Sequence, residues 1–276
     1  MIRIRYQTMR RVINYWRQPI SIGALSILML FPLLSLAAGP GAQEDKLVGH
    51  WTFEKGSELK DLMGNFADIK LNGAKIKDGK LDVDSGKWAI ATPYKGPDIL
   101  DKTLVSWASI DSLKVQKGSI LTIDRLSDPT FDAIVLGERQ NQRWMAGSGW
   151  FHRTQDPKPG FEETKENRMA QLAISYKKIG GGEGTAHVVI YHNGVKIGDY
   201  KQGIFPLFAK DDCEAIWGIR HGGVGGGPGN MDAKIEDARI YATVLSQGEV
   251  KALRPDTLAI EALAKLATTW AAIKAR

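Results

Sequence analysis

The feature of this 276-residue chain that most constrains its fold is a long succession of short apolar runs with an alternating pattern. Between residues 46 and 241, about a dozen such runs are separated by turn-forming residues, and no helical pattern intervenes. Alternation at period two places successive side chains on opposite faces of a strand. The sequence therefore predicts an all-β fold, namely a two-sheet antiparallel sandwich of the jelly-roll type.

The clearest local pattern is HVVIYHNGVKIGDY, residues 187–200. Two alternating runs flank Asn193-Gly194, and an Asn-Gly pair favours the tight turn of a β-hairpin. Residues 67–84 carry the same signal twice, at Asn72-Gly73 and at Asp78-Gly79. We expect a hairpin at each of these positions.

The last predicted strand is KIEDARIY, residues 234–241. Strict alternation along this run would place four side chains on one mixed face, namely those of Ile235, Asp237, Arg239 and Tyr241. Ser246 and Glu249 then form a capping-box pattern, which predicts a short helix. A second, amphipathic helix is expected over residues 256–276 as a short C-terminal tail.

The first 38 residues have the pattern of an export signal. Five arginines precede an apolar run over residues 20–38, and small residues at its end fit the preference of a signal peptidase. The run also approaches the ~20 residues that span a bilayer, so an uncleaved anchor is the alternative. In either case we expect the rest of the chain to be secreted or periplasmic, with membrane contact only through this segment if it is uncleaved.

The charge of the exported part argues against nucleic acid as a partner. The chain has 37 Lys+Arg and 31 Asp+Glu, but five arginines and no acidic residue lie before Ile20. Without those five, 32 basic residues face 31 acidic ones, a net charge of +1. No basic stripe remains to attract a phosphate backbone. The single cysteine, Cys213, excludes an intrachain disulfide, so stability must come from core burial.

Several motifs occur in a characteristic order: WTF with DLMGN downstream, AISY followed by VVIYHNGVKI, then WGIR, and finally IEDARIY followed by LSQGEV. In these motifs, residues 46–253 resemble the LamG-like members of the concanavalin A-like lectin/glucanase superfamily. The closing strand and the short helix after it carry the strongest part of the likeness. The resemblance implies a two-sheet jelly roll over residues 46–253.

The resemblance also implies a structural Ca²⁺ where the first and last strands meet. Asp237 matches the carboxylate of the closing strand, and Glu54 lies on the opening strand. A calcium ion needs six to eight oxygen ligands, so these two carboxylates alone do not suffice. The alternative is that Asp237 and Arg239 belong to an ion-pair network at the sheet edge.

Aromatic and basic side chains gather in RWMAGSGWFHRT, residues 143–154, beside a polar irregular segment where binding residues concentrate on β-sandwiches. Indole faces stack on sugar rings while polar groups bind hydroxyls, so we expect a carbohydrate site here. His221, at the start of the glycine-rich segment over residues 220–230, is expected to close the same pocket. Burial of the tryptophans in the core is the alternative. The predicted ligand-binding residues are Trp144, Trp150, His152, Arg153 and His221.

No catalytic residue is predicted. Glucanases of this superfamily carry an E-x-D-x-x-E pattern on one strand. This pattern places two carboxylates on the same face, at the separation that retaining hydrolysis needs. The pattern is absent, and the carboxylates of EETKE, residues 162–166, lie in a polar segment. We expect an exported, non-catalytic module whose partner is a glycan or an envelope protein. The alternatives are a structural or protein-interaction module of the cell envelope and a divergent glycoside hydrolase.

Overall fold

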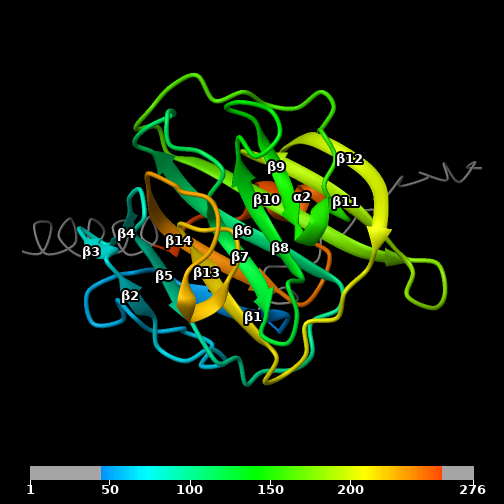
Figure 1. Ribbon diagram of the computed structural model, residues 1–276, viewed down its shortest axis with the longest axis horizontal. Helices are drawn as coiled ribbons and strands as arrows, with labels where there is room; N and C mark the ends of the chain where they lie inside the picture. Colours follow the sequence, from blue (N-terminus) through cyan, green and yellow to red (C-terminus); the bar gives the residue numbers. More distant parts are fainter. Residues whose placement is uncertain (1–44, 257–276) are drawn as a thin grey trace, which may run out of the picture. The chain divides into compact units, whose positions relative to one another are not determined.

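The computed structural model describes residues 45–256, and these form a sandwich of two antiparallel sheets (Figure 1). The predicted jelly-roll sandwich is confirmed. The expected export signal over residues 1–38 and all but the first residue of the expected helix over residues 256–276 lie outside the described residues. Within residues 45–256, no helix has the length and apolar character needed to span a membrane.

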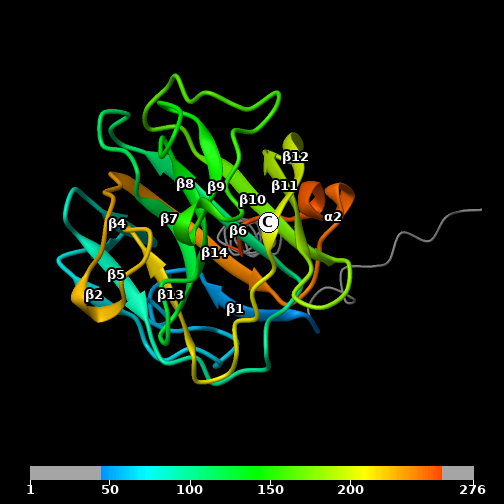
Figure 2. The ribbon, with the colours of Figure 1, turned by 45° about the vertical axis from the view of Figure 1, so that its right-hand side comes forward.

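One sheet has eight strands, and its long strands lie next to one another from the edge strand β12 to β14. Its order is β12 (Val195–Ile204), β11 (Thr185–His192), β10 (Ala170–Ile179), β6 (Lys102–Ile110), β14 (Ala233–Tyr241), β4 (Lys80–Val83) and β3 (Lys75–Lys77), with β1 (Leu47–Trp51) also paired to β14. The short helix α2 (Gln247–Ala252) lies beside β12 (Figure 2). Its capping box is present: Ser246 Oγ accepts from the Glu249 backbone N–H, and the Ser246 N–H donates to the Glu249 carboxylate.

The second sheet has six strands and carries the candidate site on its outer face. Its order is β2 (Lys70–Asn72), β5 (Trp88–Ala91), β13 (Cys213–Trp217), β7 (Ser119–Arg125), β8 (Phe131–Leu136) and β9 (Trp144–Ser148). Two short 3₁₀ turns, η1 (Gly149–Phe151) and η2 (Gly223–Gly225), follow β9 and β13.

Two of the three predicted hairpins are confirmed. Asn193-Gly194 joins β11 to β12 and Asp78-Gly79 joins β3 to β4, with both residues of each pair at positive φ. The prediction for Asn72-Gly73 was wrong, because β2 pairs with β5 in one sheet whereas β3 pairs with β4 in the other. That turn therefore passes the chain between sheets, a choice that depends on long-range pairing rather than on local turn chemistry.

The strand β14 departs from strict alternation. A register shift between Ile235 and Asp237 in its pairing with β6 marks a β-bulge, which changes the phase of the side chains. Ile235 therefore shares the core between the sheets with Ala238 and Ile240, while Tyr241 packs in a separate cluster on the outer face. The expected common face of Ile235 and Asp237 was wrong for this reason.

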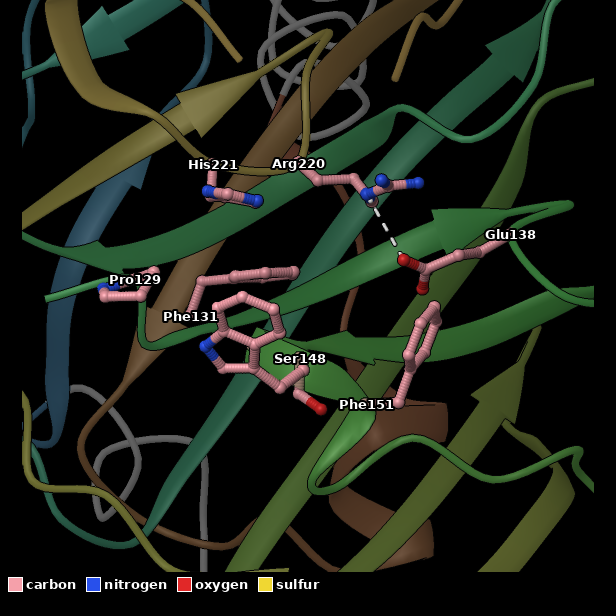
Figure 3. Close-up of a pocket in the computed structure, with 9 residues that line it drawn as sticks. Pro129, Phe131, Glu138, Ser148, Phe151, Arg220 and His221 are labelled. Carbon is pink, nitrogen blue, oxygen red and sulfur yellow. Dashed lines mark ion pairs between the residues drawn. The ribbon is translucent and has the colours of Figure 1, made fainter. Parts of the chain in front are cut away.

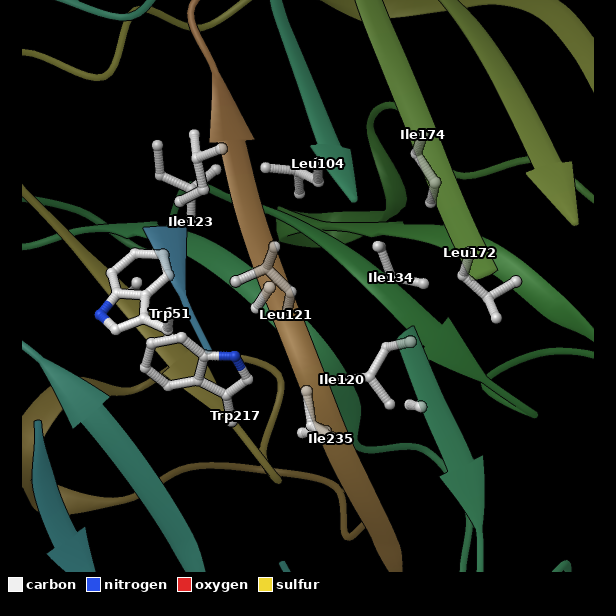
Figure 4. Packing of buried hydrophobic residues seen from close by; sticks show 14 of the residues in the cluster. Trp51, Leu104, Ile120, Leu121, Ile123, Ile134, Leu172, Ile174, Trp217 and Ile235 are labelled. Atoms are coloured by element: carbon white, nitrogen blue, oxygen red, sulfur yellow. The ribbon is translucent and has the colours of Figure 1, made fainter. Parts of the chain in front are cut away.

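The main hydrophobic core lies between the two sheets. Trp51 from β1 and Trp217 from β13 meet edge to face, with ring centroids 4.9 Å apart, and aliphatic side chains of both sheets surround them (Figure 4). Both indoles are fully buried. Each such aromatic pair contributes about 0.5–1.5 kcal/mol beyond the burial of its area, so this contact helps to hold the two layers in register.

One cluster of charges lies inside this apolar core. Asp132 of β8 points inward. Its Oδ2 forms an ion pair with Lys102 Nζ at 3.0 Å, and its Oδ1 accepts a hydrogen bond from Arg153 Nε at 2.7 Å. Lys102 and Asp132 are fully buried, and the Lys102 ammonium also lies 4.7–5.0 Å from the ring centroids of Tyr176, Phe205 and Phe208. Burial lowers the pKa of Lys102, while the Asp132 carboxylate acts against that shift. A charged group in such surroundings is stable only with its partner present.

We expect Asp132→Ala to lower the free energy of unfolding by about 3–5 kcal/mol, because it leaves the buried Lys102 and Arg153 without a counter-charge. The exposed Asp68, paired with Lys60 at the surface, supplies the control: Asp68→Ala should cost less than about 1 kcal/mol. Chemical denaturation of both variants checks this. Equal losses would show that the buried cluster adds nothing beyond a surface pair.

Candidate ligand-binding site

The structure divides the five predicted ligand-binding residues into two groups. Trp144 and Arg153 are buried, with exposed fractions of 1% and 2%. Trp150 is 77% exposed, His152 is exposed, and His221 is half-buried. Trp144 and Arg153 therefore present no surface to a ligand, and the cause in each case is a specific buried polar partner.

Arg153 anchors the segment that carries the exposed aromatics. Besides its ion pair with Asp132, its guanidinium donates to the backbone carbonyls of Phe131 at 2.9 Å and Ile204 at 3.1 Å. Its own N–H donates to Ser148 Oγ at 2.8 Å. These bonds hold the Arg153 side chain in the interior, where it positions the segment before it. Arg153 therefore has a structural role in place of the expected direct contact with a ligand.

Trp144, the first residue of β9, is likewise held by a buried carboxylate, that of Glu163. Its indole N–H donates to Glu163 Oε1 at 3.0 Å, and His192 Nε2 lies 2.9 Å from the same oxygen. The His192 ring stacks on Phe161 with centroids 3.7 Å apart. Burial would raise the pKa of Glu163, but the hydrogen bonds from His192 and Trp144 outweigh burial and hold it below its ordinary value. Trp144 is thus part of the sandwich, as the alternative interpretation expected.

Between Ser148 and Arg153 the backbone turns so that two aromatic rings point outward. Trp150 and Phe151 have φ of 54° and 57°, which L-residues adopt only when the surroundings impose it. Gly149 is required because a Cβ there would lie 2.4 Å from the Pro129 carbonyl. The result is an indole that is 77% exposed and a phenyl ring that is 46% exposed, on a backbone held from within by Arg153.

Both rings line a hollow of about 200 Å³ on the outer face of the six-stranded sheet. Figure 3 shows this hollow from close by, with Phe151 and His221 among the labelled residues. Its wall is made of aromatic rings, one ion pair and small residues, namely Pro129, Phe131, Glu138, Ser148, Gly149, Trp150, Phe151, Arg220 and His221. Of the predicted residues, Trp150 and His221 line the hollow, while His152 does not.

The polar groups of the hollow are fixed by their neighbours. His221 stacks on Phe131, with ring centroids 4.6 Å apart. Burial and then the nearby Arg220 lower the pKa of His221, so the imidazole is neutral at pH 7. Arg220 Nε lies 3.2 Å from Glu138 Oε1. Burial raises the pKa of Glu138, against the charges of Arg220 and Arg139.

Sequence reasoning missed Phe131, Phe151 and Glu138. In the run FDAIVL, Asp132 is the one charged side chain. A charged side chain on a strand ordinarily faces solvent, which would turn its neighbour Phe131 inward. The structure has the reverse, because Asp132 meets Lys102 and Arg153 in the interior. No local signal in the sequence could reveal this inversion, since both partners are distant along the chain.

The two expected calcium ligands are not brought together. Asp237 accepts from Arg239 Nε at 2.9 Å and Nη2 at 2.7 Å, and His50 Nε2 lies 3.3 Å from its Oδ2. Asp256 also accepts from Arg239 Nη2, at 2.9 Å. In the described part of the chain, the metal-like cluster at Asp237 comprises His50, Asp237 and Asp256 and does not include Glu54.

This arrangement does not fit a calcium ion at Asp237. The Arg239 guanidinium already supplies the positive charge between the two aspartates, and its carbon lies 5.0 Å from the Trp107 ring centroid. A metal ion there would have to displace a buried arginine. The ion-pair network that was the alternative interpretation describes these contacts better, and calcium binding by Glu54 and Asp237 stays a prediction.

The carboxylates of EETKE also have structural partners. Glu162 pairs with Arg143 at 3.0 Å, Glu163 binds Trp144 and His192, and Glu166 accepts the Leu113 N–H at 2.9 Å. Glu138 is the one carboxylate among the residues that line the hollow. A retaining glycosidase needs two carboxylates about 5–5.5 Å apart, and the wall of the hollow does not supply the second.

No protein-family model matches this sequence, and none of the curated proteins matches it either. Among solved structures, the chain is similar to Trypanosoma rangeli sialidase, with a TM-score of 0.53, 14% identity and coverage of 77% of this chain and 33% of that chain. For the botulinum neurotoxin serotype D/C binding domain, the TM-score is 0.50 and the identity 14%, with coverage of 75% of this chain and 51% of that chain. Domain 4 of a GH43 extracellular arabinanase from Geobacillus stearothermophilus, in complex with arabinotriose, has a TM-score of 0.47 and 20% identity. The match covers 75% of this chain and 97% of that chain.

The likeness to the sialidase and to the neurotoxin domain concerns the fold alone, because the identities are below 25%. The chain spans a third of the sialidase and about half of the neurotoxin structure. Together with the two antiparallel sheets, these neighbours define the chain as a β-sandwich of the jelly-roll class. They do not identify it as a LamG-like domain.

The Asp237 network generates a prediction on acid stability. Burial would raise the pKa of Asp237, but His50 and Arg239 outweigh burial and hold it below its ordinary value. The stabilisation by this carboxylate is therefore complete above the unfolded pKa of about 3.9 and is lost as the pH falls through the lower folded pKa. Asp237→Asn should lower stability by about 1.5–3 kcal/mol at pH 7, because Arg239 loses its buried counter-charge and keeps only the partly exposed Asp256.

Urea unfolding between pH 7 and pH 2.5 measures this effect. Below pH 4 the difference in unfolding free energy between wild type and Asp237→Asn should narrow. Glu183→Gln, at an exposed position, is the control and should be as stable as wild type at every pH. A constant gap between wild type and Asp237→Asn over the whole range would contradict the assigned pKa shift.

Proposed function

We propose that this chain is a non-catalytic binding module and that its ligand is a carbohydrate, bound in the hollow beside Trp150. The observation that carries the proposal is a tryptophan left 77% exposed on a backbone that a buried arginine holds in place. Full burial of a large apolar side chain stabilises by about 1.5–3 kcal/mol. An indole kept in solvent at a rigid position is therefore better explained by a ligand than by the fold.

The chemistry of the wall suits a sugar ring. The C–H face of a pyranose or furanose stacks on indole, and the Arg220–Glu138 pair offers donors and acceptors for hydroxyl groups. The neutral His221 adds a further hydrogen-bonding edge without a charge. At about 200 Å³, the hollow is smaller than the roughly 300–1,000 Å³ of enclosed small-molecule pockets. This size favours shallow contact with one residue of a longer glycan.

The proposal includes the place where the module works. The apolar segment over residues 20–38 supports export to the periplasm or cell surface, where glycans are abundant. A LamG-like assignment remains a prediction from the motifs. Binding of an envelope protein is the second candidate, since Phe151 is exposed next to Trp150 and paired aromatics also anchor protein interfaces.

A glycan array probed with the full-length chain, followed by titration of the best glycan, tests the proposal. We expect Trp150→Ala to weaken binding at least about tenfold, equivalent to the ~1.4 kcal/mol of one stacking contact, with an unchanged melting temperature because the ring is exposed. Arg153→Ala should lower both binding and stability, since it removes the buried anchor.

Leu126→Ala, at an exposed apolar position outside the hollow, is the matched control and should leave binding unchanged. Equal weakening by Leu126→Ala and Trp150→Ala would overturn the assignment of the site. Absence of any glycan ligand, combined with Trp150-dependent capture of an envelope protein, would favour the second candidate.

A further inference from the structure

A row of side chains crosses the outer face of the six-stranded sheet next to the hollow. The register pairs Glu214 of β13 with Asp124 of β7, and Asp124 with Phe131 of β8. These side chains face away from the core, because their neighbours along the strands, Ile123 and Ala215 among them, belong to the core between the sheets. Glu214 and Asp124 are thus adjacent carboxyls on one surface.

The glycine-rich segment lies directly over this row. While the His221 ring stacks on Phe131, the Gly222 N–H donates to Asp124 Oδ2 at 2.9 Å. A Cβ on Gly223 would come within 3.1 Å of Glu214 Oε1. Gly222 and Gly223 have φ of 120° and 62°, so glycine is needed for the main chain to follow this path.

The covered carboxyls lack the partners that buried charges require. Asp124 and Glu214 are 2% and 1% exposed, and Asp124 Oδ1 and both Glu214 oxygens have no hydrogen-bond partner. Burial, reinforced by the charge of Glu214, raises the pKa of Asp124 to about 7 against the Gly222 hydrogen bond. Burial also raises the pKa of Glu214, against the nearby Thr92 hydroxyl. Among the described residues, no lysine, arginine or histidine pairs with either carboxyl.

We propose that Asp124 and Glu214 bind a divalent metal ion of the Ca²⁺ class beneath the glycine-rich segment. Unpaired buried carboxylates are costly, and orphaned buried oxygens are where an ion is expected. Their three free atoms are hard oxygen donors, the type that Ca²⁺ prefers, and the Thr92 hydroxyl lies beside Glu214. Ca²⁺ accepts irregular coordination, which suits carbonyls supplied by a glycine-rich segment.

Several other acidic side chains of the described chain differ in that they have a basic partner. Arg239 lies between Asp237 and Asp256, and Lys87 binds Asp84 at 2.5 Å. Lys234 binds Asp111. No basic side chain of the described chain pairs with Asp124 or Glu214, so an external cation would supply the missing counter-charge.

Calcium binding to the full-length chain, stripped with EDTA and kept at pH 7.5, tests the inference. We expect one bound Ca²⁺ per chain by isothermal titration calorimetry, and a rise in melting temperature of about 5 °C or more at 100-fold excess over the Kd. Glu214→Gln and Asp124→Asn should each abolish both signals. In EDTA, Glu214→Gln should melt no lower than wild type, because it removes one of two adjacent buried charges.

Asp82→Asn, in a separate acidic group near Lys75 and Asp84, is the matched control and should keep the full calcium response. Failure of the wild-type chain to bind calcium would overturn the inference, as would a response retained in Glu214→Gln but lost in Asp237→Asn. A pair that holds a shared proton instead would show no calcium signal and a melting temperature that falls between pH 5 and pH 8. The measurement uses no sugar, so its failure leaves the carbohydrate proposal intact.

Discussion

The rest of this structure depends on one inward-facing carboxylate, Asp132. It forms ion pairs with Lys102 from the opposite sheet and with Arg153 from the segment after β9, and both contacts are buried. Apolar packing alone tolerates small slips between two sheets, whereas a buried ion pair has one acceptable geometry, because an unpaired charge in the core costs several kcal/mol. The relative position of the sheets and the course of residues 149–153 consequently depend on the same carboxylate, through one oxygen each.

The candidate site is a consequence of this anchor. Since Arg153 is held from within, the turn before it must present Trp150 and Phe151 to solvent, even though both adopt backbone angles that L-residues disfavour. Because Asp132 turns inward, its neighbour Phe131 turns outward and receives the His221 ring. Two features of the hollow that look unrelated in the sequence thus share one cause in the core.

The glycine-rich segment connects the hollow to the proposed cation site. Its first residues, Arg220 and His221, line the hollow, whereas the next two lie over Asp124 and Glu214. An ion bound beneath the segment would hold the His221 wall in place from below, in the way that Arg153 holds the Trp150 wall. On this proposal both walls of the hollow rest on buried charges: the Asp132–Arg153 pair is complete within the chain, and Asp124 and Glu214 would be completed by the bound ion.

Local patterns in the sequence were sufficient for the strands, for the hairpins at Asn193-Gly194 and Asp78-Gly79, and for the capping box at Ser246, because period-two alternation and turn chemistry act between near neighbours. They also singled out Trp150 and His221. Tertiary structure decided what depends on distant partners: the bulge that turns Ile235 into the core, the burial of Trp144 and Arg153, the inversion of Phe131 and Asp132, and the passage of Asn72-Gly73 between sheets. The physical reason is that a buried charge selects its face by where its counter-charge lies, and that counter-charge is supplied by residues far away along the chain.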